Sequence, residues 1–167
     1  MRRFALHRSL LIALAAPTLG ALVLTGCGPG YLDSAEKIPA TDENKAVYDV
    51  VKAYHQAVEN KDIESLKAMV SQKYHENGGT TDDPADDYGY DKLIAKLDML
   101  VKNVKKVQFK LRLVGMDVHE HDATVDFEYV GRALLTEGGA DRYSTFQDFK
   151  RMVLVREDGK WMIQGGL

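Results

Sequence analysis

The hydrophobic pattern of the first half of the chain is helical. Between Val47 and Val58, apolar residues recur every three or four positions, which is the repeat of an amphipathic helix. A second, shorter apolar stripe follows at residues 63–70. Asp62 stands between the two stripes, where a helix N-cap is expected. The pattern therefore predicts a helix over about residues 42–59 and a second one that begins just after Asp62.

The second half of the chain changes its period. Residues 90–103 still repeat with helical spacing, but from Val107 onward apolar and polar residues alternate, which predicts strands. The alternation slips at Gly115, which indicates a β-bulge. Residues 119–122 form a predicted tight hairpin and residues 137–141 a longer turn. Four successive strands follow from this pattern.

This order of elements predicts an α+β fold. The sheet must bury one apolar face, and the helices are the only elements available to cover it. On the opposite face, Lys110 and Arg112 of one strand can pair with Asp126 and Glu128 of the next. We expect three N-terminal helices packed on a curved antiparallel four-stranded sheet.

Two short motifs resemble those of a known superfamily. Residues 57–66 read AVENKDIESL at the first helix junction, and residues 157–163 read EDGKWMI in the last hairpin. Both are similar to motifs of the nuclear-transport-factor-2-like superfamily, also called the cystatin-like α+β cone, over about residues 42–167. The resemblance implies a cone with an inner pocket. The superfamily includes ketosteroid isomerases, polyketide cyclases, limonene-epoxide hydrolases, transport factors and non-catalytic accessory domains, so the fold alone selects no activity.

The implied cone assigns aromatic residues to the pocket wall. Aromatic side chains at such spacings are more often part of the packed core, so a cone filled by its own side chains is the alternative. The pocket-lining candidates are Tyr54, Tyr129, Tyr143, Phe149 and Trp161.

The strands offer two acids for the buried base that an isomerase of this kind needs. Asp126 alternates with Val125 and Phe127 and should face away from the core, and Asp148 beside Phe149 is no better placed. An apolar pocket with a few hydroxyl groups is typical of a binding site. We therefore expect a non-catalytic binding or accessory module for a small apolar ligand or a protein partner. A small-molecule isomerase, cyclase or hydrolase is the alternative.

Two clusters contain metal-ligating residue types. His119 and His121 share one side of an extended strand, but they lie at a predicted hairpin tip with no third ligand in view. The aspartates within residues 82–87 suit calcium but lack the spacing of a calcium-binding loop. His55 lies next to the core stripe, either at the pocket rim or on a half-exposed helix face. We expect no metal and no cofactor.

The first 27 residues resemble the signal of a bacterial lipoprotein. Three arginines precede an apolar run at residues 10–23, which is shorter than the about 20 residues that span a bilayer. Leu24-Thr25-Gly26-Cys27 then resembles a lipobox, which implies acylation of Cys27, with palmitate among the acyl groups. Cys27 is the only cysteine, so no intramolecular disulfide can form.

The signal divides the chain into three parts. We expect a signal peptide at residues 1–26, a flexible Pro- and Gly-containing tether at residues 27–40 and the cone domain at residues 41–167. The product would be exported and lipid-anchored at the cell envelope. Gly28 favours the periplasmic side of the outer membrane if the source has two membranes.

The charge of the mature chain limits its partners. Of the 22 basic residues, three lie in the signal, so 19 remain against 25 acidic residues, a net charge of −6. Nucleic-acid binding depends on basic clusters that displace counterions, so this balance argues against it.

We predict that the mature protein begins at an acylated Cys27. Mass spectrometry of the native N-terminus should show lipid on this residue, and Cys27→Ser should leave the precursor uncleaved by the lipoprotein pathway. A water-soluble, unacylated product that starts at another residue contradicts this prediction.

Overall fold

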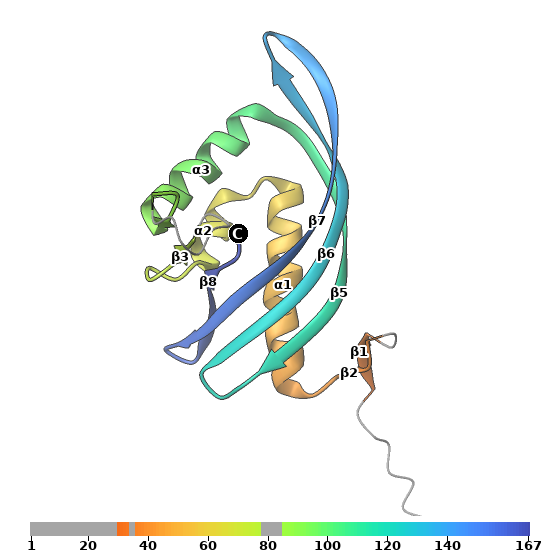
Figure 1. Ribbon diagram of the computed structural model, residues 1–167, viewed down its shortest axis with the longest axis vertical. Coiled ribbons are helices and arrows are strands. Elements are labelled where there is room, and N and C mark those ends of the chain that lie inside the picture. The colour runs from red at the N-terminus through yellow and green to blue at the C-terminus, as the bar shows by residue number, and fades with distance from the viewer. Residues whose placement is uncertain (1–29, 34–35, 78–84) are drawn as a thin grey trace, which may run out of the picture.

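The computed structural model describes residues 30–33, 36–77 and 85–167, with the elements in the order shown in Figure 1. The signal peptide, the lipobox and Asp82 and Asp83 lie outside the described residues. The helices are α1 (Asp42–Asn60), α2 (Ile63–Met69) and α3 (Tyr90–Asn103). The main sheet consists of β5 (Val104–Val118), β6 (Asp122–Glu137), β7 (Ala140–Glu157) and β8 (Lys160–Gly165).

The four strands form an antiparallel meander in the order β5-β6-β7-β8. The helices lie on one side of this long, curved sheet, and the far ends of β6 and β7 extend beyond them (Figure 1). Two short strands, β3 (His75–Glu76) and β4 (Tyr88–Gly89), pair between α2 and α3. The predicted α+β architecture is confirmed, with helices at nearly the predicted bounds.

Local capping sets where the helices begin. The Thr41 hydroxyl accepts a hydrogen bond from the Asn44 amide at 3.1 Å, which caps α1. Asp62 accepts hydrogen bonds from the Ser65 amide at 3.0 Å and from the Ser65 hydroxyl at 2.6 Å, which confirms the predicted cap of α2. Between the helices, Lys61 adopts a left-handed conformation with φ of 56°, so the chain turns within two residues.

The core lies between α1 and the inner face of the sheet. Val47 and Val51 of α1 are fully buried there, and Leu66 of α2 and Leu93 of α3 are almost so. The sheet contributes alternate residues, as the pleat requires. Its buried members include Leu113, Ala123, Val125, Phe127, Met152, Leu154 and Ile163.

Side chains of α1 also bind the backbone of the edge strand β5. The Phe109 amide donates to Glu59 Oε1 at 3.0 Å, and His55 Nε2 lies 2.8 Å from the Phe109 carbonyl oxygen. These backbone groups point away from β6, where the edge would otherwise be unpaired. The two contacts therefore attach α1 to the sheet at one residue.

The strand pairing confirms the predicted bulge. The register between β5 and β6 shifts between Leu113 and Gly115, and the inward positions change from odd to even numbers, so that Met116 faces Val125. Further along, Gly131 lies so close to β5 that an added Cβ would overlap the Gln108 carbonyl oxygen and the Phe109 side chain. A bulge increases strand twist and bending, and the sheet curves around the helices.

Some of the ion pairs predicted for the outer face of the sheet are present, and others are not. Arg112 binds Glu128 at 3.0 Å across β5 and β6, as predicted. Asp126 instead binds Arg151 of β7 through two hydrogen bonds of 2.7 and 2.8 Å, and this guanidinium lowers the pKa of the Asp126 carboxyl. Lys110 lies opposite Val130, so its predicted pairing is wrong.

Two sequence-based predictions need correction. The turn at residues 137–141 is tight, because Gly138 and Gly139 both adopt positive φ and let β6 and β7 pair up to the turn. Part of the predicted tether, residues 27–40, is folded: β1 (Tyr31–Asp33) pairs with β2 (Ile38–Pro39), and Ile38 is buried in the core. Ile38 stands in a short stretch with no helical or strand period, so sequence could not reveal its burial.

The glycine contacts provide a stability test. Gly131→Ala should lower the free energy of unfolding by about 1–3 kcal/mol or more, because the methyl group has no room against β5. Gly115→Ala is the matched control, since its added methyl group would meet nothing closer than 3.6 Å. Urea denaturation of both variants checks this. Equal losses of stability would contradict the proposed close approach at Gly131.

Candidate functional site

A cavity of about 310 Å³ lies between the helices and the inner face of the sheet. This volume falls at the lower end of the roughly 300–1,000 Å³ common for small-molecule sites. All three helices and the strands β5, β6 and β7 contribute to its wall. The lining residues are Tyr54, Val58, Leu66, Leu97, Leu100, Val104, Val107, Phe109, Phe127, Tyr129, Phe146, Lys150 and Leu167.

The sheet side of the cavity is aromatic. The Tyr129 ring lies 6.2 Å from Phe109 and 5.7 Å from Phe146, measured between centroids. Phe127 lies 6.4 Å from Tyr129 on the same strand. These residues are brought together because Phe109 and Phe146 both pair with Gly131, which flanks Tyr129 on β6 and has no side chain of its own.

The Tyr54 hydroxyl is a polar group within this apolar wall. Burial raises the pKa of Tyr54 to about 12, and the nearby Tyr129 adds to the shift. Among the described residues the hydroxyl has no hydrogen-bond partner. The Tyr54 side chain keeps part of its surface accessible, because it lines a cavity that is large enough to hold water. It therefore stays protonated at neutral pH and can donate a hydrogen bond to a molecule in the cavity.

Tyr129 of the cavity wall forms a hydrogen bond with the acidic residue Asp148 of β7. Its hydroxyl donates to Asp148 Oδ2 at 3.5 Å, and desolvation together with this carboxylate raises the pKa of Tyr129. The Asp148 side chain is exposed and also accepts a hydrogen bond from the Phe149 amide at 2.8 Å. Asp148 is thus better placed than Asp126, contrary to the sequence-based expectation, because it lies opposite Tyr129 in the strand register.

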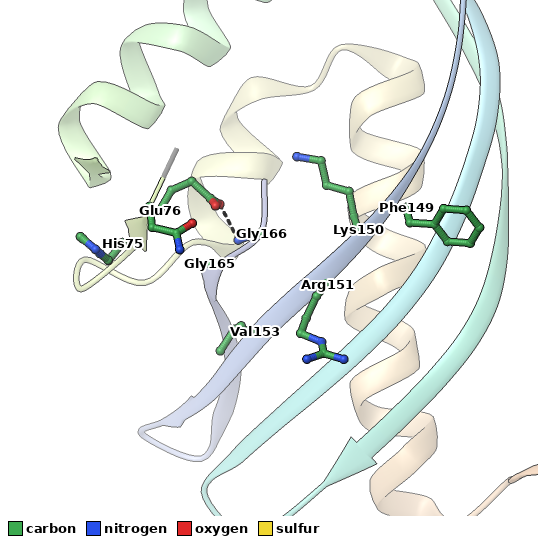
Figure 2. Close-up of a pocket in the computed structure, with 9 residues that line it drawn as sticks. His75, Glu76, Phe149, Lys150, Arg151, Val153, Gly165 and Gly166 are labelled. Atoms are coloured by element: carbon green, nitrogen blue, oxygen red, sulfur yellow. Dashed lines mark hydrogen bonds between the residues drawn. The ribbon is translucent and has the colours of Figure 1, made fainter. Parts of the chain in front are cut away.

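Lys150 joins the cavity to a second hollow. It lines the apolar cavity and also a more polar hollow of about 520 Å³ beside β8. Figure 2 shows the Lys150 side chain leaving β7 in the direction opposite to Phe149. In the second hollow, Glu76 accepts a hydrogen bond from the Gly166 amide at 2.8 Å (Figure 2). Arg151 is paired with Asp126. The main polar groups of that hollow are thus already engaged.

Of the five sequence-predicted pocket residues, Tyr54 and Tyr129 line the cavity. Tyr143 and Phe149 do not: they lie on the outer face and are 63% and 62% exposed. Trp161 is buried instead beneath Arg156, whose guanidinium carbon lies 4.5 Å from the ring centroid. Tyr143 and Phe149 were misplaced because strand direction and register decide which face a residue joins. Trp161 instead belongs to the packed core, which was the alternative to a place in the pocket wall.

Sequence reasoning missed Lys150, Phe146 and Phe109 as cavity residues. No sequence signal marked the first two. Residues 152–155 read MVLV, so apolar residues occupy both faces of β7 there and define no inward parity. The structure buries Met152 and Leu154, which places Phe146 and Lys150 on the same, inner face.

No histidine of the described residues lies in the cavity wall. His119 and His121 are exposed at the hairpin between β5 and β6, next to Asp117 and Glu120. His55 is half-buried and contacts the Phe109 ring at a centroid distance of 4.4 Å. In the described ranges, no group of three or more histidine, cysteine, aspartate or glutamate residues is placed to hold a metal ion.

This architecture defines a nuclear-transport-factor-2-like protein with an inner cavity. The chain matches the family model of the SnoaL-like domain over residues 47–165, and it belongs to that family. A comparison with curated protein sequences finds no match.

Solved structures with the same fold are distant in sequence. A candidate scytalone dehydratase from Novosphingobium aromaticivorans superposes with a TM-score of 0.62 at 16% identity, covering 74% of this chain and 80% of that one. A ketosteroid isomerase-like protein from Erwinia carotovora atroseptica gives 0.60 at 17% identity, covering 75% and 94%. A candidate dehydratase of the NTF2-like family from Streptomyces avermitilis gives 0.58 at 14% identity, covering 74% and 93%. At such identities the likeness shows the fold alone.

The Tyr54 hydroxyl provides a test of whether the cavity is built for a ligand. Tyr54→Phe should leave the free energy of unfolding unchanged or slightly raised, because it removes a buried donor that has no partner in the described structure. Tyr74→Phe is the control. Its hydroxyl binds Glu76 and the Leu167 amide, both at 3.0 Å, so its loss should cost about 1–3 kcal/mol. Denaturant unfolding compares the two, and an equal cost for Tyr54→Phe would indicate a structural role.

Proposed function

We propose that this protein is a lipid-anchored exported module that binds a small apolar ligand in the cavity without transforming it. The observation that carries the proposal is the cavity itself. It is open, its wall is almost entirely apolar and aromatic, and it contains a buried hydroxyl with no partner in the described structure. An apolar site with a few convergent polar groups is the usual form of a small-molecule site.

The anchor is supported by the N-terminal sequence. Its basic residues, apolar run and the Leu24–Cys27 motif follow one another in the order of a lipoprotein signal. Each buried methylene of an acyl chain contributes about 0.8 kcal/mol to membrane binding, so two or more chains on Cys27 would hold the protein stably. In the described residues, no helix is long and apolar enough to cross a membrane.

Binding is favoured over catalysis by the polar groups of the cavity. General acid–base catalysis needs a titratable group within hydrogen-bond reach of the reacting atom, usually with its pKa adjusted by burial. Tyr54 has its pKa moved further from neutrality, and the carboxylate of Asp148 is exposed at the rim. A phenol with a raised pKa is a poor acid or base at neutral pH, and the Asp148 carboxylate is not enclosed by the cavity.

An enzyme of isomerase, dehydratase or related type remains the second candidate. One observation favours it: Tyr129 and Asp148 form a hydroxyl–carboxylate pair at the cavity, 3.5 Å apart. The isomerase-like and dehydratase neighbours have the same fold. The length of this contact and the exposure of the carboxylate are the reasons to rank it second. A purely protein-binding role ranks lower, because it leaves the open cavity without a use.

The binding proposal can be tested with a neutral apolar probe. The full-length protein in lipid nanodiscs should bind 2-naphthalenemethanol saturably, with empty nanodiscs as the blank. Leu100→Trp adds bulk at the cavity wall and should weaken this binding by about tenfold or more, since it fills space that the probe needs. Isothermal titration calorimetry measures the effect.

Val130→Trp is the matched control for this experiment. Val130 is also an exposed apolar residue, but it lies on the outer face of β6, away from the cavity. Unchanged binding in Val130→Trp together with lost binding in Leu100→Trp supports the cavity as the site. No saturable binding, or equal loss in both variants, would overturn the proposal.

A further inference from the structure

We propose that the ligand is an amphiphile with an apolar body and an anionic, carboxylate-type head group, and that Lys150 binds this head. This inference rests on the proposed binding function and adds the chemical class of the ligand. Three observations carry it: the position of Lys150, the engagement of the neighbouring acid, and the kind of polar groups that the cavity presents.

Lys150 occupies the boundary between apolar and polar surroundings. On the sheet it lies directly opposite Phe127, a fully buried residue of the cavity wall. Its side chain also borders the more polar hollow that contains His75 and Glu76 (Figure 2). An apolar body in the cavity would therefore have its end near the Lys150 ammonium group.

The ammonium group of Lys150 is available to a ligand. It forms no ion pair and no hydrogen bond within the described part of the chain. The nearest acid on the same face of β7 is Asp148, and that carboxylate accepts hydrogen bonds from the Tyr129 hydroxyl and the Phe149 amide instead. By contrast, the next residue, Arg151, is fully paired with Asp126 on the outer face.

The polar groups around the cavity favour an acceptor over a donor. An ammonium group offers only donors, and the Tyr54 phenol is held in its protonated, donating form by burial. Hydrogen bonds from a charged donor to an anion are roughly twice as strong as those between neutral groups. A carboxylate head satisfies these donors better than an alcohol, and an ammonium head would be repelled.

A lysine at such a boundary has an ordinary alternative role. Its methylene stem can cover apolar surface while the charge reaches water. In that case the charge contributes nothing to ligand choice, and Lys150→Met, which keeps most of the apolar stem, would leave the head-group preference unchanged. The two roles therefore give different results in one experiment.

The experiment compares three probes that share one ring system and differ in the head group. They are 2-naphthoate, 2-naphthalenemethanol and 2-naphthylmethylammonium, titrated by calorimetry into the full-length protein in nanodiscs of zwitterionic lipid. The wild type should bind naphthoate at least about tenfold more tightly than the alcohol, the size expected for a hydrogen bond to a charged group. The ammonium probe should bind more weakly than the alcohol.

Two variants assign the preference to Lys150. Lys150→Met should reduce the preference for naphthoate over the alcohol to less than about threefold, because the charged donor is removed while most of the apolar stem is kept. Lys110→Met is the matched control: Lys110 is exposed on the edge strand β5 and does not line the cavity, so its removal should leave the preference intact.

The outcomes separate this inference from the function on which it rests. If the alcohol binds saturably but naphthoate binds no better, the cavity is a ligand site and the anionic class is wrong. If the preference survives Lys150→Met or is lost equally in Lys110→Met, Lys150 is not the head-group partner. If no probe binds, both the proposed function and the ligand class are overturned.

Discussion

The attachment of α1 to the curved sheet is the constraint on which the rest of the structure depends. α1 is held in two ways: by Val47 and Val51 in the core, and by the side chains of Glu59 and His55 on the backbone of Phe109. The apolar contacts supply the free energy, while the polar contacts determine position because hydrogen bonds are directional. A helix held at this distance from a concave sheet cannot fill the space above the middle of β5 and β6, and the cavity is that space.

The chemistry of the cavity follows from this geometry. Apolar side chains from all three helices face an aromatic patch on the strands, so water in the cavity has few partners. The Tyr54 hydroxyl is costly in such a place unless a ligand engages it. Natural chains rarely keep a buried polar group without a use, and here the residue lines an open cavity of ligand size.

The family relationship explains the scaffold and leaves the activity to the side chains. The SnoaL-like match covers the helices and the sheet, and the solved neighbours with the same fold include isomerase-like and dehydratase proteins. The side chains on the inner face follow from the strand register. In the pairing of β6 with β7, Tyr129 lies opposite Asp148, and Phe127 lies opposite Lys150.

The sequence by itself determined the features that depend on neighbours along the chain. The helices at 42–60, 63–69 and 90–103, the cap at Asp62 and the bulge at Gly115 were all predictable, because helical period, capping and strand alternation are local patterns. Only the tertiary structure decided which aromatic residues line the cavity. Tyr143 and Phe149 face outward and Lys150 inward because β7 has polar residues on both faces, so its side-chain directions follow from pairing with β6. The position of β2 likewise depends on a distant contact, the burial of Ile38 in a core made by other elements.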